Sequence, residues 1–282
     1  MIRESRTPKP MMVAISASES PDINAFGLSK GHLRDAVADL VLQVLAADMD
    51  ISYGGDLREH GLTRLLFDLV PRYTPSEDLG KRTRVTNHLP WPVHIGMPIE
   101  RLEVAAAEVK GAAKFVLVGR DGKTMTLRAR RGVATTTPSA DEWVDGLTAM
   151  RRLQRSCTDA RVVFGGQVSG YKGRMPGVAE EALLSLRGHQ PLFLVGGFGG
   201  AARDVAEILG LAKPWAGSRR NWRGQSDFEG LTGNDLNNRL SREENEALAT
   251  TPFLGQVVVL VLRGLSRLKA DRTASLGGTN HA

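Results

Sequence analysis

The chain has 282 residues, of which 41% are hydrophobic, so it can bury a large core without metal ions or disulfides. Its single cysteine, Cys157, excludes a disulfide framework within one chain. The formal net charge of +6 would attract polyanions if it were concentrated on one face, but the basic residues are spread along the chain.

Neither end of the sequence predicts a targeting or membrane segment. The N-terminus (MIRESRTPKP) has mixed charge and two prolines, and no apolar stretch follows it, which argues against a secretory signal. The longest apolar run, residues 257–262, is too short to cross a bilayer. We therefore expect a cytoplasmic protein without membrane contact.

The first seventy residues predict a β-α-β-α order. Residues 11–16 form a short apolar run typical of a strand, and residues 30–49 have apolar positions at helical spacing, with Ser29 placed to cap the helix. A second strand is expected at residues 50–53 and a second helix at 62–70.

The middle of the chain is less regular. Residues 73–89 are polar and rich in turn formers, residues 91–95 resemble a strand between prolines, and 101–109 have helical spacing. The Asp-Gly turn between 114–118 and 124–130 predicts a β-hairpin. We expect an irregular insertion with this hairpin over about 73–135.

The second half returns to alternation, which predicts a mainly parallel sheet with helices on both faces, that is, a Rossmann-like α/β fold. Helices are expected at 141–157, 176–186 and 201–209, with strands at 161–164 and 191–195. Ser241 and Glu244 have capping-box spacing, which predicts a helix at 241–248.

A final apolar helix is expected at 256–268. The expected organisation is therefore an N-terminal tail at 1–9, a single domain at 10–268 and a disordered tail at 269–282.

Small or glycine-rich residues follow the ends of predicted strands in segments 16–18, 53–56, 164–167 and 195–200. The ends of parallel strands meet at one carboxyl edge, where ligands of open α/β sheets bind. The strongest segment is FLVGGFGGAARD at 193–204, because glycines between a strand and a helix let backbone N–H groups approach phosphate oxygens. It departs from the dinucleotide pattern Gly-x-Gly-x-x-Gly, because Ala202 replaces the last glycine.

These loops and their neighbours supply the predicted ligand contacts, which are Ser16, Ser18, Gly54, Gly55, Asp56, Gly166, Lys172, Arg174, Gly196, Gly197, Phe198, Gly199, Gly200 and Arg203. The glycine N–H groups would hold phosphates, Lys172 and Arg174 would neutralise them, and Asp56 or Asp204 would accept hydrogen bonds from ribose hydroxyls. The alternatives are glycines needed only for tight turns and cations that are simply solvated. No metal and no cofactor are expected.

The segments GYKGRMPGVAEEAL and LVGGFGGAARDVAEIL, with their paired strand-glycine loops, resemble the SLOG superfamily. That grouping includes the LOG phosphoribohydrolases, the DNA-processing proteins and the N-terminal region of melastatin-type TRP channels. The resemblance is closest to prokaryotic ligand-sensing domains linked to TIR and sirtuin defence proteins. It implies a sensor of a nucleotide-derived ligand that is ADP-ribose-like, cyclic or a nucleotide-sugar. We also expect a homo-oligomer, which works alone or with a separately encoded effector.

The enzyme alternative is an N-glycosidase acting on a nucleoside monophosphate, with Glu180 and Asp204 as catalytic residues. The LOG motif Pro-Gly-Gly-x-Gly-Thr-x-x-Glu places its glutamate on Arg203, and the LOG arginine falls near Glu180. The acid and the base are thus exchanged, so the LOG mechanism does not transfer as written.

Nucleic-acid binding is the least favoured function. It would require stacking aromatic residues in a basic groove, and the chain has three tyrosines and four tryptophans. Of these, only Trp222 lies in a cluster of arginines.

Overall fold

The computed structural model describes residues 9–55, 65, 82–111, 113–215 and 221–278. Its strands are β1 (Met12–Ser18), β2 (Asp50–Gly54), β3 (Val85–Leu89), β4 (Ala113–Val118), β5 (Thr124–Met125), β6 (Ala160–Gly165) and β7 (Leu192–Val195). They form one seven-stranded sheet in the order β5-β4-β3-β2-β1-β6-β7. Neighbouring strands are parallel except for β4 and β5. The predicted Rossmann-like, mainly parallel α/β fold is confirmed.

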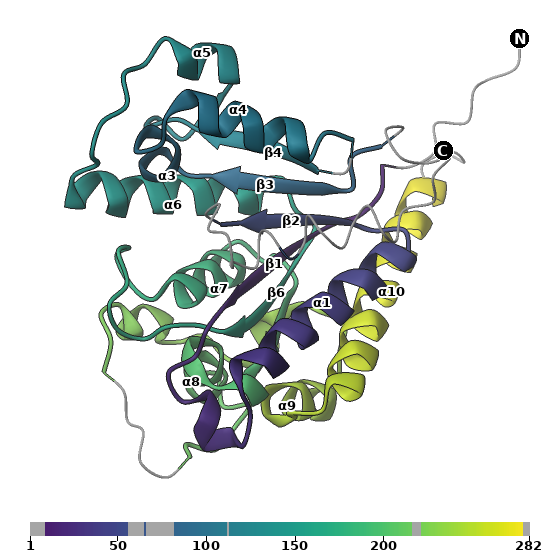
Figure 1. The fold of residues 1–282 in the computed structure, drawn as a ribbon. Helices are drawn as coiled ribbons and strands as arrows, with labels where there is room; N and C mark the ends of the chain where they lie inside the picture. The colour runs from purple at the N-terminus through teal and green to yellow at the C-terminus, as the bar shows by residue number, and fades with distance from the viewer. Residues whose placement is uncertain (1–8, 56–64, 66–81, 112, 216–220, 279–282) are drawn as a thin grey trace, which may run out of the picture.

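Helices cover both faces of this sheet (Figure 1). In chain order they are α1 (Lys30–Ala46), α3 (Trp91–Ile95), α4 (Ile99–Glu108), α5 (Leu127–Arg131), α6 (Ala140–Ser156), α7 (Gly177–Arg187), α8 (Gly200–Ile208), α9 (Arg242–Thr250) and α10 (Leu254–Gly278). Short 3-10 helices are η1 (Ile23–Phe26), η2 (Gly196–Phe198), η3 (Gln225–Phe228) and η4 (Gly233–Leu236).

The alternation of side chains along the strands divides the core between the two faces. Val13, Ile15 and Phe164 point toward α1 and α10, which lie side by side in Figure 1. On the opposite face, Val163 and Leu194 pack against α7 and α8. Both faces are covered, so the central strands are buried almost throughout.

Apart from the C-terminal helix, the helices and strands predicted in the first fifty residues and in the second half agree with the structure to within a few residues. The capping box is present, because Ser241 Oγ accepts from the Glu244 N–H at 3.1 Å and Glu244 Oε2 accepts from the Ser241 N–H at 2.8 Å. The helix predicted at 62–70 lies outside the described residues apart from residue 65, which is helical.

The middle of the chain corrects three predictions. The polar segment ending at Leu89 supplies β3, a fully buried strand paired with β2 and β4. The predicted strand at 91–95 is the helix α3, because Pro92 fits a first helical turn. The hairpin exists, but its second strand is only two residues long. Thr126 then accepts a hydrogen bond from the Ala129 N–H and begins α5.

The C-terminal helix is longer than predicted, because α10 continues through residues 269–278, which were expected to be disordered. Lys269 Nζ donates to the Ala47 carbonyl at 2.9 Å, and Arg272 lies 3.1 Å from Asp159. Asp271 also pairs with Arg239 at 2.8 Å. These contacts hold the segment 269–272 against the rest of the domain.

Candidate functional site

The chain changes direction across the sheet between β1 and β6. From β1 it passes through α1 to β2 on one side, whereas β6 and β7 lie on the other side of β1. Loops after β1 and β6 therefore diverge, and such a switch point is where open α/β sheets bind ligands. The last residues of the two strands, Ser18 and Gly165, are register partners, and the Gly166 N–H donates to the Ser18 carbonyl at 2.9 Å.

The loop after β7 joins the other two at this edge. The Ala201 N–H donates to the Gly166 carbonyl at 3.0 Å, and the Gly200 N–H donates to Asp22 Oδ1 at 3.0 Å. Ser20 Oγ also donates to Asp22. The predicted convergence of Ser18, Gly166 and Gly200 is therefore present in the structure.

The Asp22 carboxylate occupies the position where a phosphate was expected. It lies at the N-terminus of α8, where the helix dipole and unpaired N–H groups favour an anion. The Gly199 N–H is used as well, since it donates to the Gly196 carbonyl at 3.0 Å. A ligand phosphate could reach the Gly200 N–H only by replacing Asp22.

Gly196 and Gly197 are required by packing of the chain on itself. A Cβ on Gly197 would lie 1.8 Å from the Thr251 carbonyl oxygen, and one on Gly196 would lie 2.3 Å from that of Ala249. Phe198 is also buried, with its ring 6.0 Å from that of Phe164. Gly196 and Gly197 thus pack closely against the connection from α9 to α10, whereas Phe198 packs on β6.

Gly199 and Gly200 are required by both conformation and space. Their φ angles are +72° and +67°, a region that residues with a side chain rarely adopt. A Cβ on Gly200 would lie 2.4 Å from the Gly166 carbonyl oxygen, and one on Gly199 would lie 2.9 Å from Ser20 Oγ. The glycines let the three strand-end loops approach one another.

A pocket of about 320 Å³ opens beside these loops. One wall comes from the loop after β1 and the start of α1, and the other from the loop after β6. Its polar lining consists of Glu19, Ser20, Asn24, Lys30, Gln167 and Ser169. Lys30 Nζ lies 2.5 Å from Glu19 Oε2, and both side chains are more than half exposed. The volume is at the small end of ligand pockets and suits a mononucleotide or part of a larger ligand.

The predicted cations Lys172 and Arg174 contact α6. Lys172 Nζ lies 3.7 Å from the centre of the Trp143 ring, and Arg174 pairs with Asp145 at 2.9 Å. Both side chains are exposed. They belong to the same loop as Gln167 and Ser169, but they do not line the pocket.

The other predicted ligand contacts near β1 and β2 that the structure describes do not line the pocket. Ser16 is buried and its Oγ accepts from Arg161 at 2.6 Å. Gly54 lies under α6, because a Cβ there would be 2.9 Å from Met150 Sδ. Gly55 follows β2 and is partly buried, whereas Asp56 lies outside the described residues.

Glu180 is buried and takes part in an ion pair. It accepts hydrogen bonds from Thr148 Oγ1 at 2.5 Å and from Arg151. Arg203, at the position of the LOG glutamate, pairs with Glu207 at 2.7 Å and donates to the Lys213 carbonyl at 2.9 Å. Glu180 and Arg203, which stand at the exchanged LOG positions, thus form ion pairs with other residues, namely Arg151 and Glu207.

Asp204 is also buried, and its Oδ2 accepts from the Trp222 indole N–H at 3.0 Å. Trp222 is only 4% exposed and packs edge-on against Phe228. Its ring is therefore not presented for stacking on a nucleic-acid base.

Sequence reasoning missed Asp22, Lys30, Gln167 and Ser169. The prediction followed glycines, whereas Asp22, Gln167 and Ser169 are polar residues of the two loops that flank the switch point. Lys30 is the first residue of α1, and that position after a predicted first strand was the available signal.

The part of the chain that the structure describes contains neither a metal-ligand cluster nor a membrane-spanning helix. No group of three or more His, Cys, Asp or Glu side chains is arranged there to hold a metal ion. No helix of this described part has the length and apolarity needed to span a membrane.

The fold and the crevice define a Rossmann-like α/β domain with a ligand-sized pocket at its switch point. A family model described as SLOG cluster 2 matches residues 7–250, and the chain belongs to this family. The resemblance read from the two glycine-rich segments is confirmed at the level of the superfamily. No curated protein matches the chain. The matched region ends before α10.

Proposed function

We propose that the chain senses a nucleotide-derived ligand at the crevice between the ends of β1 and β6. The observation that carries this proposal is the 320 Å³ pocket at the switch point, lined by Lys30 and by polar side chains from both loops. Lys30 would bind a ligand phosphate, and Gln167 and Ser169 would donate hydrogen bonds to the sugar or base. ADP-ribose-like ligands, cyclic nucleotides and nucleotide-sugars all contain such groups.

Asp22 gives the site a way to respond to the ligand. Its carboxylate holds the N-terminus of α8, and its backbone is part of the loop that lines the pocket. A ligand phosphate would compete with this carboxylate for the Gly200 N–H, since both are anions and one donor is available. Replacement of Asp22 would free the loop after β1, which could then contact a second copy of the chain or a separately encoded effector.

Calorimetry with AMP, cyclic AMP and ADP-ribose tests the proposal. Lys30→Ala should weaken binding about tenfold or more, because it removes one charge-assisted hydrogen bond. Asp22→Ala should strengthen binding, because it frees the donor and removes a negative charge beside the phosphate. The control is Lys123→Ala, in the exposed turn between β4 and β5.

Three results would contradict this assignment. These are no binding of any of the three probes at millimolar concentration, unchanged affinity in Lys30→Ala, or weaker binding in Asp22→Ala. The last result would mean that Asp22 contacts ribose hydroxyls and that the phosphate lies elsewhere.

The hydrolase alternative receives no support from the pocket. Glu180 and Asp204 bind Arg151 and Trp222, and neither carboxylate lines the crevice. Prolonged incubation with AMP should accordingly release no free adenine above background, as measured by chromatography.

A further inference from the structure

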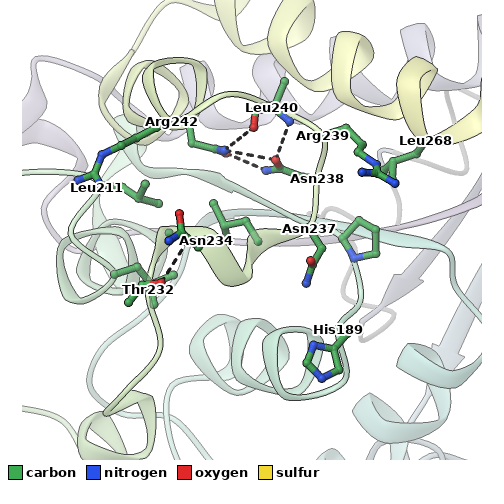
Figure 2. A pocket seen from close by; sticks show the side chains of 15 residues that line it. His189, Leu211, Thr232, Asn234, Asn237, Asn238, Arg239, Leu240, Arg242 and Leu268 are labelled. Carbon is green, nitrogen blue, oxygen red and sulfur yellow. Dashed lines mark hydrogen bonds between the residues drawn. The ribbon is translucent and has the colours of Figure 1, made fainter. Parts of the chain in front are cut away.

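A second cavity, larger than the pocket beside the glycine loops, lies at the opposite edge of the sheet. It has a volume of about 880 Å³. Its walls come from the turn that precedes β7, the end of α8, the segment 232–242 and α10 (Figure 2). Pro191 leads into β7 and Leu209 follows α8, so the cavity opens at the amino edge, away from the glycine loops.

The lining of this cavity combines an apolar wall with uncharged amides and cations. Leucines form the apolar wall. The amides are Asn234, Asn237, Asn238 and Asn245, and the cations are Arg239 and Arg242. His189 lies across the cavity from Arg242 (Figure 2). No carboxylate belongs to the described lining, so the cavity favours an anionic ligand that also has hydrogen-bonding groups.

Both arginines are available to an anion. Arg242 pairs with Glu246 at 2.9 Å and Arg239 pairs with Asp271 at 2.8 Å, and the side chains in both pairs are more than 40% exposed. Exposed pairs of this kind contribute little to stability, so a ligand can replace the carboxylates at low cost. Arg239 also has a positive φ of 63°, which is uncommon for arginine.

Two of the four asparagine amides are held in place by hydrogen bonds within the protein. Asn238 Nδ2 donates to the Leu192 carbonyl and to Asn245 Oδ1, each at 2.8 Å, which locks this pair beneath the cavity. Asn234 and Asn237 are exposed at the rim. The Asn234 side chain makes no hydrogen bond to the described residues, so both its amide atoms can pair with a ligand hydroxyl.

We infer that this cavity is a second ligand site, which binds a small organic phosphate carrying hydroxyl groups, of the sugar-phosphate class. Arg242 holds the phosphate and the Asn234 amide pairs with the hydroxyls, whereas Arg239 lies on the other side of the cavity (Figure 2). The apolar wall contacts the face of the sugar ring. This inference does not depend on the proposed nucleotide site at the carboxyl edge.

Calorimetry on the full chain tests it with glucose 6-phosphate, ribose 5-phosphate, glucose and inorganic phosphate. One of the two sugar phosphates should bind more tightly than glucose and than inorganic phosphate. Arg242→Ala and Asn234→Ala should each weaken that binding about tenfold. Arg128→Ala, on the distant α5, is the control that should leave it unchanged, and Lys30→Ala distinguishes this site from the one at the other edge. Hydrogen exchange should slow in residues 232–242 and not in residues 19–30.

The inference is overturned if neither sugar phosphate binds at millimolar concentration, or if inorganic phosphate binds equally well. It is also overturned if Arg242→Ala and Asn234→Ala bind like the unmodified chain. A loss of sugar-phosphate binding in Lys30→Ala would assign that ligand to the other edge and would likewise reject this site.

Discussion

His88 lies in the middle of β3 and is only 3% exposed. Its Nδ1 is 3.2 Å from Ser52 Oγ, and its Nε2 is 3.6 Å from Cys157 Sγ. Burial, together with the positive charges of Arg161 and Lys114, lowers the pKa of His88 from 6.5 to about 4. The folded protein therefore keeps this imidazole neutral where the unfolded chain would protonate it.

The first prediction is that stability falls as the pH drops from 7.5 to 5. Between the folded pKa of about 4 and the unfolded value of 6.5, the unfolded chain binds more protons, so protonation favours unfolding. The free energy of unfolding should decrease by about 2 kcal/mol from this group alone. His94, whose pKa is also lowered chiefly by burial, acts in the same direction.

Urea denaturation of the wild type and of His88→Gln at both pH values measures this contribution. Carboxylates titrate equally in the two proteins, so the difference between their pH dependences isolates His88. Equal slopes in the two proteins would show that the imidazole is not kept neutral by the fold.

At the scale of elements, a buried ion network joins α6, α7 and β6. Arg151 bridges Glu180 and Glu181, and Arg161 contacts Glu181 at 3.2 Å. Arg161 is fully buried and also donates to Ser16, Gln154 and Ser185. Because each of these charges is paired, removal of one partner leaves the opposite charge buried without full compensation.

The second prediction compares this network with a surface pair. Arg161→Met should lower the free energy of unfolding by about 3–5 kcal/mol, because it leaves Glu181 with one partner fewer in the core. Arg174→Met removes an ion pair whose side chains are 50% and 69% exposed, and it should cost less than about 1 kcal/mol. Chemical denaturation of both variants checks the difference. Similar losses in the two would mean that the buried network does not hold α7 on the sheet.

Elements that follow a local hydrophobic pattern could be predicted from the sequence, whereas elements that depend on packing against distant segments could not. The alternating strands and helices of the second half follow from local hydrophobic patterns. In β3, by contrast, Thr86, Asn87 and His88 read as a polar loop, although all three are buried. Their strand character comes from the flanking strands β2 and β4, which no local window contains.

The same distinction applies to the candidate site. Glycines at strand ends predicted which edge the loops would share, and the loops that contain Ser18, Gly166 and Gly200 meet at that edge. The partners of those glycines could not be predicted, since Asp22 is 178 positions from Gly200 in the chain. Thr251, which packs onto Gly197, is likewise brought there only by the complete fold.

At the scale of the whole molecule, the sheet is stabilised from both faces, and α10 completes one of them. Val257, Val261 and Leu265 of α10 are fully buried against the core that α1 and the central strands form. Each such side chain contributes about 1.5–3 kcal/mol, and a domain has only about 5–15 kcal/mol in total. This helix, which follows the matched family region, therefore belongs to the folded domain.

The third prediction tests that integration with two substitutions on the same helix. Leu265→Ala should destabilise the whole chain by about 2–5 kcal/mol, because it opens a cavity between α10 and the sheet. Val259→Ala, at a position that is 54% exposed, should change stability by no more than about 0.5 kcal/mol. Thermal unfolding followed by circular dichroism and by tryptophan fluorescence should give one coincident transition that shifts only in Leu265→Ala. A separate early transition in that variant, with the main one unmoved, would mean that α10 is an appendage that unfolds without the sheet.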